Sequence, residues 1–579
     1  MERAVQQAVA KVLPDADMSS VLVRPCPDPK FGDYQTNALM SLAKERKLNP
    51  CQLAADVLTQ LNVSEWCEKV EIAGAGFLNF RLKVSALEQT LAAVARGGHL
   101  FFEKAAEPRT IVIDFSSPNV AKPMHVGHIR STVLGDCLAR TLRLLGHRVV
   151  TDNHIGDWGT QFGKLLLGWK GQLDRAALAA DPIGEMERLY KSTNAACETD
   201  ADLLERARQE LVKLQNGDAE NLVIWREMIE LSQHQFDTLY GRLGVEFDFT
   251  LGESFYNPRL KQVVAELRER GIARESEGAI CVFSDGSLPP KEDPFLKQQD
   301  GQWTPNPCLI QKSDGAANYA TTDLATLAYR FETWQPAEIV YVTDGRQQLH
   351  FRQLFAIFRR WHPDAKVKLS HVWFGSILGE NNTPFKTRSG ETVKLAELLD
   401  EAESRALAIV SEKNPNLSET ERREIARVIG LGAIKYADLS PNRQSDYVFS
   451  WDKMLSFAGN TAPYLQYAYA RIRSIFRKAG AGMSPAAEIR LIATEEITLA
   501  KKLLHFGLVL EAVTEDYRPN YLCNYLYELA GVFTGFYEAC PVLKAADAER
   551  ASRLALCDLT SRVLQQGLAL LGIETVEQM

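Results

Sequence analysis

The fold is decided at residues 110–132, which read TIVIDFSSPNVAKPMHVGHIRST. The apolar run at residues 110–115 is typical of a strand buried in a parallel sheet. A helical pattern follows in GHIRSTVLGDCLARTLRLLG, where Gly146 gives a stop, and HRVVTDN, residues 147–153, predicts a second strand. The sequence therefore predicts a β-α-β unit with the loop SSPNVAKPMHVGH between its first strand and its helix.

Further strand signals occur later in the chain. They read GAICVF (residues 278–283), AEIVYVTD (337–344) and KLSHVWFGSIL (368–378). The residues from about 165 to 245 are helical in pattern and rich in charge, so we expect a parallel sheet that carries a helical insertion. From about residue 395 the pattern is nearly all helical.

The first 108 residues have a different texture. They mix helical stretches with the extended piece VEIAGAGFLNFRL, residues 70–82, whose glycines indicate a turn or a close backbone approach. The segment AAEPRT, which contains Pro108, is a plausible linker. We therefore expect a multidomain α/β protein. Its predicted units are residues 1–108, a sheet domain at 109–395 with the insertion, a helical connection at 396–455 and a helical domain at 456–579.

Composition narrows the class of protein. The chain has 579 residues, 46% hydrophobic and 24% charged, which is typical of a soluble protein with several cores. No apolar stretch is long enough to cross a bilayer, and the start of the sequence lacks a signal-type apolar core, so we expect a cytoplasmic protein. Its ten cysteines form no C-x-x-C pair, which argues against a zinc ribbon or a disulfide framework. A net charge of −8 argues against indiscriminate nucleic-acid coating but allows a local RNA-binding face.

The loop of residues 116–128 is placed to bind a ligand. In open α/β sheets, ligands bind beyond the carboxyl ends of the strands, where helix N-termini present free N–H groups. Gly127 would let a nucleotide approach the backbone, His125 and His128 can donate hydrogen bonds to phosphate, and Lys122 adds a mobile positive charge. Two other interpretations are a zinc-binding His-x-x-His pair, for which no third ligand lies nearby, and two helix-start histidines held by ordinary hydrogen bonds.

The loop resembles the HIGH signature of class I aminoacyl-tRNA synthetases, and the longer string at residues 114–132 resembles the arginyl-tRNA synthetase family. Further blocks similar to that family span the chain. They include PKFGDYQTNALMSLAK, IGDWGTQFGKLL, LGESFYNP, ANYATTDLATLAYR, YVTDGRQQLHFRQLF and NTAPYLQYAYARIRSI. The resemblance implies a Rossmann-type catalytic core that converts L-arginine and ATP to arginyl-adenylate and then charges tRNA(Arg). It also implies that tRNA is needed for the first step and that Mg²⁺ enters with ATP. No protein-bound zinc or other resident metal is expected.

By this resemblance, His125, Gly127 and His128 hold ATP and stabilise its transition state. Class I enzymes usually carry a second signature, KMSKS, whose second lysine contacts the phosphates. This chain reads FKTRSG at residues 385–390, so that lysine is missing. The resemblance implies that Lys122 takes its place, with Lys386 and Arg388 as secondary candidates. The alternative interpretation of Lys386 and Arg388 is a solvated basic loop that contacts no ligand.

The same resemblance assigns an arginine pocket. Its positions are Asp114, Asn119, Tyr319, Asp323 and Gln347. Carboxylate and amide oxygens suit the planar guanidinium fork, and Tyr319 and Asp323, four apart, would share a helix face. A helix cap by Asp323 and a core position for Tyr319 are the alternatives.

The tRNA contacts are expected at both ends of the chain. Tyr464, Tyr467 and Arg471 line one face of a predicted helix, where aromatic rings can stack bases and arginine can meet phosphate, although a tyrosine stripe is also common in cores. The resemblance favours an anticodon-binding domain here and an N-terminal module that contacts the tRNA elbow.

Two rival functions remain at this point. One is a nucleotidyltransferase with the same H-x-G-H motif that acts without tRNA, and the other is a catalytically silent tRNA-binding paralogue. The family pattern at Lys122, His125 and His128 argues against the second rival. No separate editing domain is expected, because a pocket built for a guanidinium rejects other amino acids. We expect a monomer.

Overall fold

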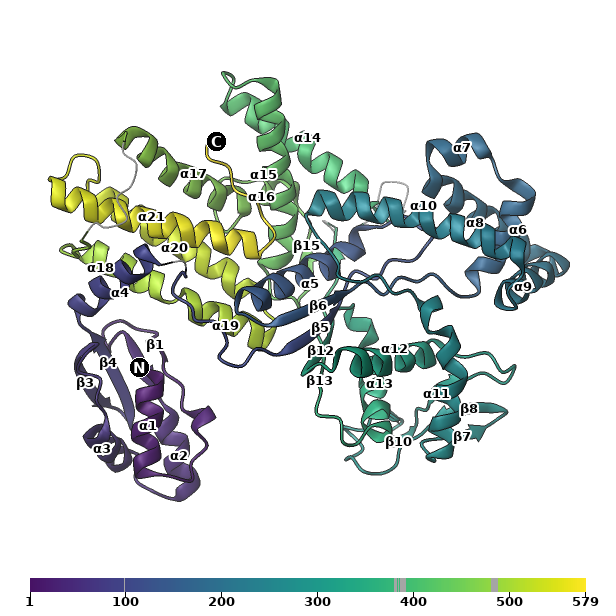
Figure 1. The fold of residues 1–579 in the computed structure, drawn as a ribbon, viewed down its shortest axis with the longest axis horizontal. Helices are drawn as coiled ribbons and strands as arrows, with labels where there is room; N and C mark the ends of the chain where they lie inside the picture. Colours follow the sequence, from purple (N-terminus) through teal and green to yellow (C-terminus); the bar gives the residue numbers. More distant parts are fainter. Residues whose placement is uncertain (98, 380–382, 384, 386–391, 481–487) are drawn as a thin grey trace.

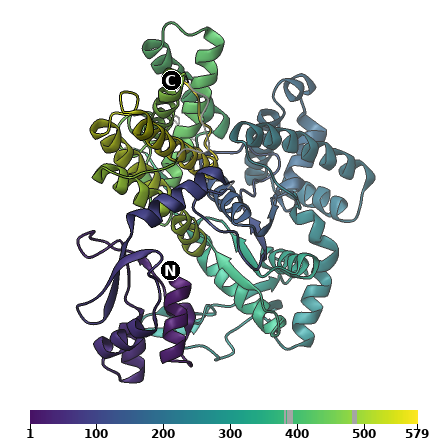
Figure 2. The same ribbon diagram turned by 60° about the vertical axis from the view of Figure 1, so that its left-hand side comes forward.

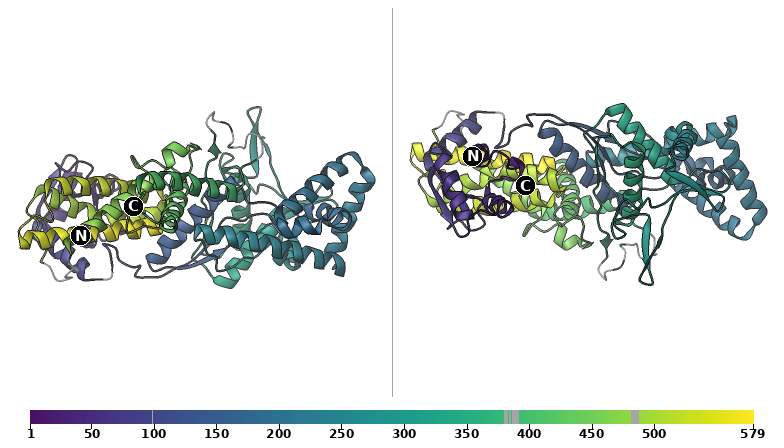
Figure 3. Two further views of the ribbon diagram at one scale, coloured as in Figure 1. Left: turned by 90° about the horizontal axis from the view of Figure 1, so that it is seen from above. Right: turned by 90° about the horizontal axis from the view of Figure 1, so that it is seen from below.

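The computed structural model describes residues 1–97, 99–379, 383, 385, 392–480 and 488–579. The molecule is elongated, with the core sheet near its middle (Figure 1; Figure 3). One end is formed by inserted helices, and the other by the N-terminal module and the C-terminal helices. No helix in these described ranges combines the length and apolar character needed to span a membrane.

The core is a four-stranded parallel sheet in the order β13-β12-β5-β6. Its strands are β5 (Thr110–Asp114), β6 (Arg148–Asp152), β12 (Glu338–Tyr341) and β13 (Lys368–His371). Helix α5 (Val126–Leu144) connects β5 to β6, which confirms the predicted β-α-β unit. Helices α12 (Tyr319–Trp334) and α13 (Gln348–Trp361) precede and follow β12.

One predicted strand forms, but it pairs with strands outside the core sheet, so its assignment to that sheet was wrong. Residues 279–282 form β8 (Ala279–Val282), which pairs antiparallel with β7 (Ala273–Ser276) and β11 (Cys308–Gln311) in a separate three-stranded sheet. Between β8 and β11 lies the hairpin of β9 (Leu296–Gln299) and β10 (Gln302–Pro305). An apolar run identifies a buried strand but does not select its neighbour, so GAICVF was assigned to the wrong sheet.

The third strand signal is divided between two sheets. Only residues 368–371 of KLSHVWFGSIL join the core sheet, and β14 (Ile377–Leu378) pairs in parallel with β15 (Tyr447–Val448). Between α5 and β7 the helices form the insertion and the segment after it. They are α6 (Gln161–Gln172), α7 (Arg175–Ala180), α8 (Pro182–Thr199), α9 (Ala201–Gln215), α10 (Ala219–Leu243), the 3-10 turn η2 (Glu253–Tyr256) and α11 (Asn257–Glu269).

The C-terminal part is helical. Its elements are α14 (Leu395–Lys413), α15 (Glu419–Leu439), α16 (Trp451–Met454), α17 (Ala462–Ala479), α18 (Thr494–Leu504), α19 (Phe506–Asp516), α20 (Asn520–Ala539) and α21 (Asp547–Leu570). Helix α5 is tied to this region by a buried ion pair between Arg130 and Asp438, 3.1 Å apart, and Arg130 also donates to the carbonyl oxygens of Gly375 and Ser445. Because a buried charge without a partner is costly, this pair holds α5 and α15 in a fixed relation.

The N-terminal module is a small α+β unit. It contains α1 (Glu2–Val12), the 3-10 turn η1 (Met18–Ser20), β1 (Arg24–Pro25), β2 (Tyr34–Thr36), α2 (Ala38–Arg46), α3 (Pro50–Gln60), β3 (Cys67–Ala73), β4 (Phe77–Leu82) and α4 (Val84–Arg96). Gly74 and Gly76, both with positive φ, form the β3–β4 turn, as the glycines indicated. The module docks on the C-terminal helices (Figure 2), where Lys501 pairs with Asp33 at 2.7 Å and Glu88 accepts from the Leu491 backbone N–H.

Arg330 joins helix α12 to the core sheet. Its fully buried guanidinium lies 2.7 Å from Asp114 and 2.8 Å from Asp152, the last residues of β5 and β6. The two carboxylates would repel each other without this cation, so the ends of the two strands depend on it.

We expect Arg330→Met to lower the free energy of unfolding by about 3–5 kcal/mol, because it leaves two buried carboxylates without their partner. Urea denaturation followed by circular dichroism measures this change. Arg423→Met, which breaks an exposed pair with Glu419, is the matched control and should leave the midpoint unchanged. Equal effects of the two variants would contradict the role given to Arg330.

Candidate active site

The loop between β5 and α5 has an unusual backbone. Ser116, Ser117 and Ala121 all have positive φ, a conformation that L-residues rarely adopt. Their backbone N–H groups donate to Ser131 Oγ at 2.8 Å, Asn153 Oδ1 at 3.0 Å and Ser232 Oγ at 3.0 Å, respectively. Bonds from three separate elements therefore hold this strained loop in one shape, a feature common at ligand sites.

His125 and His128 stand at the start of α5 with their rings 4.1 Å apart. His125 Nδ1 accepts from the Gly127 backbone N–H, and His128 Nδ1 accepts from the His125 backbone N–H, both at 3.1 Å. Burial lowers the pKa of both imidazoles, that of His128 to about 3; the charge of Lys122 adds to the shift of His125, and His125 adds to the shift of His128. Both rings are therefore neutral near pH 7, and each Nε2 carries the proton as a hydrogen-bond donor.

Gly127 is required by this arrangement. A Cβ there would lie 2.9 Å from the His125 ring, so any other residue would disturb the cap. Gly127 is exposed, and Lys122 is partly exposed in the same loop. The structure thus brings Lys122, His125, Gly127 and His128 together, whereas Lys386 and Arg388 lie outside the described residues.

Tyr319 and Asp323 share one face of α12, as predicted. The Tyr319 ring lies 5.0 Å from the His350 ring, and His350 Nε2 is 2.6 Å from Asp323 Oδ2. Asn318 is the N-cap residue of this helix and Tyr319 is 63% exposed, so a cap by Asp323 and a core position for Tyr319 are both excluded.

The other three predicted pocket residues are placed differently. Asp114 is buried beneath the loop, where it pairs with Arg330 and accepts from the Ser117 hydroxyl. Asn119 is exposed in the loop beside Gly156, where a Cβ would come within 2.3 Å of its Oδ1. Gln347 is exposed at the end of the 3-10 turn η3 (Gly345–Gln347).

Sequence reasoning did not single out Glu253, which lies in η2. Burial raises the pKa of its carboxyl to about 7; His154 opposes this shift, and Asp323 and Asp157 add to it. The charge of Asp323 thus acts on Glu253 through space, and His154 lies 4.0 Å from Asp323. The motif LGESFYNP contains Glu253, but only the fold shows that η2 lies against α12. Two acidic groups at a partly open site can receive a cation such as a guanidinium.

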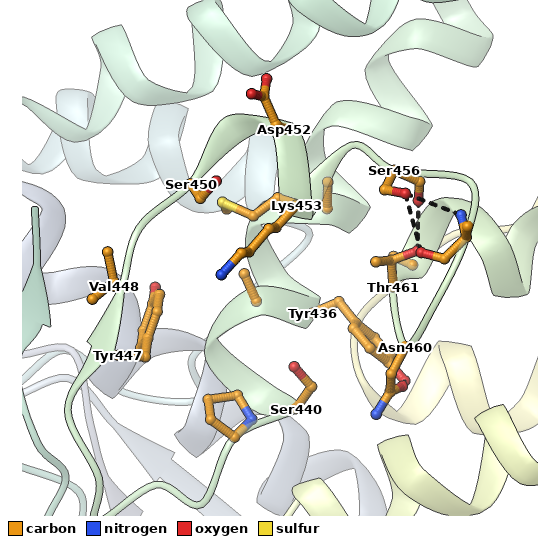
Figure 4. Close-up of a pocket in the computed structure, with 16 residues that line it drawn as sticks. Tyr436, Ser440, Tyr447, Val448, Ser450, Asp452, Lys453, Ser456, Asn460 and Thr461 are labelled. Atoms are coloured by element: carbon orange, nitrogen blue, oxygen red, sulfur yellow. Dashed lines mark hydrogen bonds between the residues drawn. The ribbon is translucent and has the colours of Figure 1, made fainter. Parts of the chain in front are cut away.

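Another cavity lies elsewhere, between α15, the segment of β15 and α16, and α17 (Figure 4). Its volume is about 550 Å³, and the ammonium group of Lys453 points into it. The hydroxyl of Tyr436 donates to Asn460, and Thr461 caps α17. The cavity therefore adjoins the helix that carries the predicted tRNA contacts and is separate from the histidine loop.

The predicted tRNA-binding residues lie on α17. Tyr467 is 46% exposed, while Tyr464 is half-buried with its ring 5.5 Å from that of Tyr527. The guanidinium of Arg471 lies 5.1 Å from the ring of Tyr537. These residues thus pack partly against neighbouring rings and still present aromatic and cationic surface to the solvent.

No group of three or more His, Cys, Asp or Glu side chains is arranged to hold a metal in the part of the chain that the structure describes. Most residues of the site follow the carboxyl ends of β5, β6 and β12 or stand in the first turns of α5 and α12. This is the place where open parallel sheets bind nucleotides.

A parallel sheet with neutral H-x-G-H imidazoles at the first crossover helix is typical of H-x-G-H nucleotidyltransferases, and the similarity to known proteins identifies this one as a class I aminoacyl-tRNA synthetase. Residues 90–451 match the family model of the class I (R) tRNA synthetase catalytic domain. Residues 1–82 match the arginyl-tRNA synthetase N-terminal domain, and residues 465–579 the DALR anticodon-binding domain. The chain belongs to the arginyl-tRNA synthetase family, so it activates arginine and charges tRNA.

Individual relatives cover the whole chain. It is 46% identical to the arginine–tRNA ligase of Cellvibrio japonicus over 100% of this chain and 99% of that protein. The enzyme of Haemophilus ducreyi is 45% identical, with 96% and 98% covered. Among solved structures, the arginyl-tRNA synthetase of Plasmodium falciparum has a TM-score of 0.83 at 29% identity, with 100% and 98% covered. That of Thermus thermophilus has a TM-score of 0.82 at 26% identity, with both chains fully covered.

We expect Glu253 to meet the guanidinium of arginine, and the pKa of its carboxyl then predicts how arginine binding depends on pH. Below about pH 7 the carboxyl gains a proton and loses its attraction for the guanidinium, which stays charged. We expect the KM for arginine to rise about tenfold as the pH falls from 8 to 6. Pyrophosphate-exchange kinetics across this range measure it.

Glu253→Gln should give a high KM for arginine that no longer changes over the same pH range. Glu269→Gln, at an exposed site on α11, is the control and should behave like wild type. A pH-dependent KM that persists in Glu253→Gln would assign the titration to another group.

Proposed function

We propose that the histidine loop holds ATP and stabilises the transition state of arginine activation. The arginine carboxylate attacks the α-phosphate, the bond to pyrophosphate breaks, and arginyl-adenylate forms. The observation that supports this role is the fixed tautomer of His125 and His128, whose Nδ1 atoms are held by backbone N–H groups. Their Nε2–H groups stay free to donate to phosphate oxygens as charge develops, and the neutral rings need no change of protonation.

Lys122 and Gly127 complete the ATP site in this proposal. Gly127 gives the nucleotide access to the backbone, and Lys122 takes the place of the second KMSKS lysine, which FKTRSG lacks. Lys386 and Arg388 are secondary phosphate contacts. Mg²⁺ arrives with ATP as part of the substrate, where it shields the phosphates.

The arginine pocket is proposed to form around the N-terminal turns of α12. Asp323 and Glu253 would meet the guanidinium, with Tyr319 packing over the ligand and Asn119 and Gln347 offering amide groups. Asp114 would support the pocket from beneath the loop, because its salt bridge to Arg330 holds the end of β5, where the loop begins.

The second step is proposed to use four units of the chain. Residues 109–395, with the insertion at about 165–245, carry the catalytic site, and residues 396–455 connect it to the anticodon-binding domain at 456–579. Residues 1–108 would contact the tRNA elbow. The arginyl group passes to the terminal adenosine of tRNA(Arg) with release of AMP, and bound tRNA is required for activation. We further propose that the enzyme is a cytoplasmic monomer.

ATP–pyrophosphate exchange, with each amino acid and with or without total tRNA, tests the tRNA requirement. We expect exchange with arginine alone and only when tRNA is present. Exchange with arginine in the absence of tRNA would overturn the requirement, while the absence of exchange under any condition would contradict activation itself.

We expect His128→Ala to lower the rate of arginine activation by about 10²–10³-fold, because it removes a donor to the developing phosphate charge. Its affinity for tRNA, measured by filter binding, should stay within about twofold of wild type. His234→Ala, at an exposed position on α10, is the control. Equal loss of activation and tRNA binding would mean that His128 is structural.

Tyr467→Ala should raise the KM for tRNA about tenfold without changing the activation rate at saturating tRNA, because it removes a ring that can stack a base. Tyr467→Phe keeps the ring and should resemble wild type. A loss of activation rate with an unchanged KM for tRNA would argue against a contact with tRNA at this residue.

A further inference from the structure

Helix α8 of the insertion contacts the catalytic loop through an aromatic ring. The ammonium group of Lys122 lies 5.4 Å from the centroid of the Tyr190 ring, within the range of a cation–π interaction. Tyr190 is half-buried and packs against the main hydrophobic core, so its ring is held in place. The loop residue Lys122 therefore has a rigid neighbour from a segment distant in the sequence.

The same helix also contacts the chain on the other side of the histidines. Glu187, one turn before Tyr190, lies 3.7 Å from the ammonium group of Lys394. The backbone of Lys394 pairs antiparallel with His125. Two hydrogen bonds of 2.9 Å, from Val126 N–H to Val393 O and from Leu395 N–H to Met124 O, close this pairing.

Residues 187 and 190 are three apart and so face the same side of α8. Tyr190 contacts Lys122, which precedes the histidines, and Glu187 contacts Lys394, which lies in the segment paired with His125. Helix α8 therefore contacts both the loop that precedes α5 and the segment paired with that loop.

An aromatic partner can hold a lysine in place while its charge stays available to bind a ligand. A carboxylate beside Lys122 would neutralise the ammonium group, whereas a ring face attracts the cation and leaves its charge and its N–H donors available. Within the described ranges, no Asp or Glu forms an ion pair with Lys122. Lysine has a flexible stem, so holding it near its working position lowers the entropy cost of reaching a phosphate.

We infer that Tyr190 is a positioning residue that holds Lys122 toward the α-phosphate region of ATP. The inference rests on the role proposed above for Lys122. It assigns to the helical insertion a part in arginine activation: α8 restrains, through a ring face, the cation that stands in for the missing KMSKS lysine.

The test is steady-state ATP–pyrophosphate exchange with arginine and saturating tRNA for Tyr190→Leu, Tyr190→Phe, Lys122→Ala and the double variant Lys122→Ala/Tyr190→Leu. We expect Tyr190→Leu to lower kcat about tenfold with an unchanged KM for arginine. Tyr190→Phe keeps the ring face and should stay within about twofold of wild type. Phe283→Leu is the matched control, since it removes a ring 4.5 Å from the guanidinium of Arg274, away from the histidine loop and the tRNA-binding units, and should leave kcat unchanged.

The double variant separates positioning from general packing. If Tyr190 acts through Lys122, the double variant has the same kcat as Lys122→Ala. If Tyr190→Leu lowers kcat as much in the Lys122→Ala background as in wild type, Tyr190 acts on packing and the inference is overturned. It is also overturned if Lys122→Ala is strongly impaired while Tyr190→Leu is normal.

A separate outcome concerns the proposal for Lys122 itself. Normal kcat in Lys122→Ala would refute the phosphate role of that lysine, and with it the positioning role of Tyr190, while exchange with arginine would still stand. Thermal unfolding of every variant, at equal protein concentration, identifies any loss of kcat that comes from loss of fold.

Discussion

The catalytic core depends on the guanidinium of Arg330, which lies between the carboxylates of Asp114 and Asp152 with no exposed surface. The two carboxylates end neighbouring strands, and the cation comes from the helix whose first turns carry Tyr319 and Asp323. One buried charge therefore sets the position of the histidine loop, which departs from Asp114, relative to the proposed arginine pocket. Because each of the three buried charges would be costly without its partners, Arg330, Asp114 and Asp152 keep a fixed arrangement.

The histidine loop shows how a few backbone bonds prepare side chains for chemistry. The N–H groups of His125 and Gly127 occupy one nitrogen of each ring, and burial keeps both rings neutral. The donors that remain are the ones that a growing negative charge on phosphate needs. Such preorganisation costs nothing at the moment of reaction, because the protein has already oriented the groups during folding.

The sequence predicted the parts of the molecule in which neighbours along the chain decide the structure. The β5-loop-α5 unit and the shared face of Tyr319 and Asp323 follow from apolar periodicity and from helical spacing. The partners of GAICVF, the pairing of Asp114 with Arg330 and the packing of η2, which carries Glu253, against α12 could not be predicted in this way. Each joins residues far apart in the chain, and periodicity carries no information about such pairs.

The docking of the N-terminal module has a consequence for how the protein is made. Asp33 and Glu88 contact Lys501 and Leu491, and the Gly97 carbonyl accepts from Arg562, so the early residues find their partners only in the last sixth of the chain. A ribosome adds residues one after another, and the first module emerges hundreds of residues before the helices that receive it. Until those helices are made, the contacts that dock the module cannot form, and only its own β1-β2-β4-β3 sheet and the helices packed on that sheet can hold it.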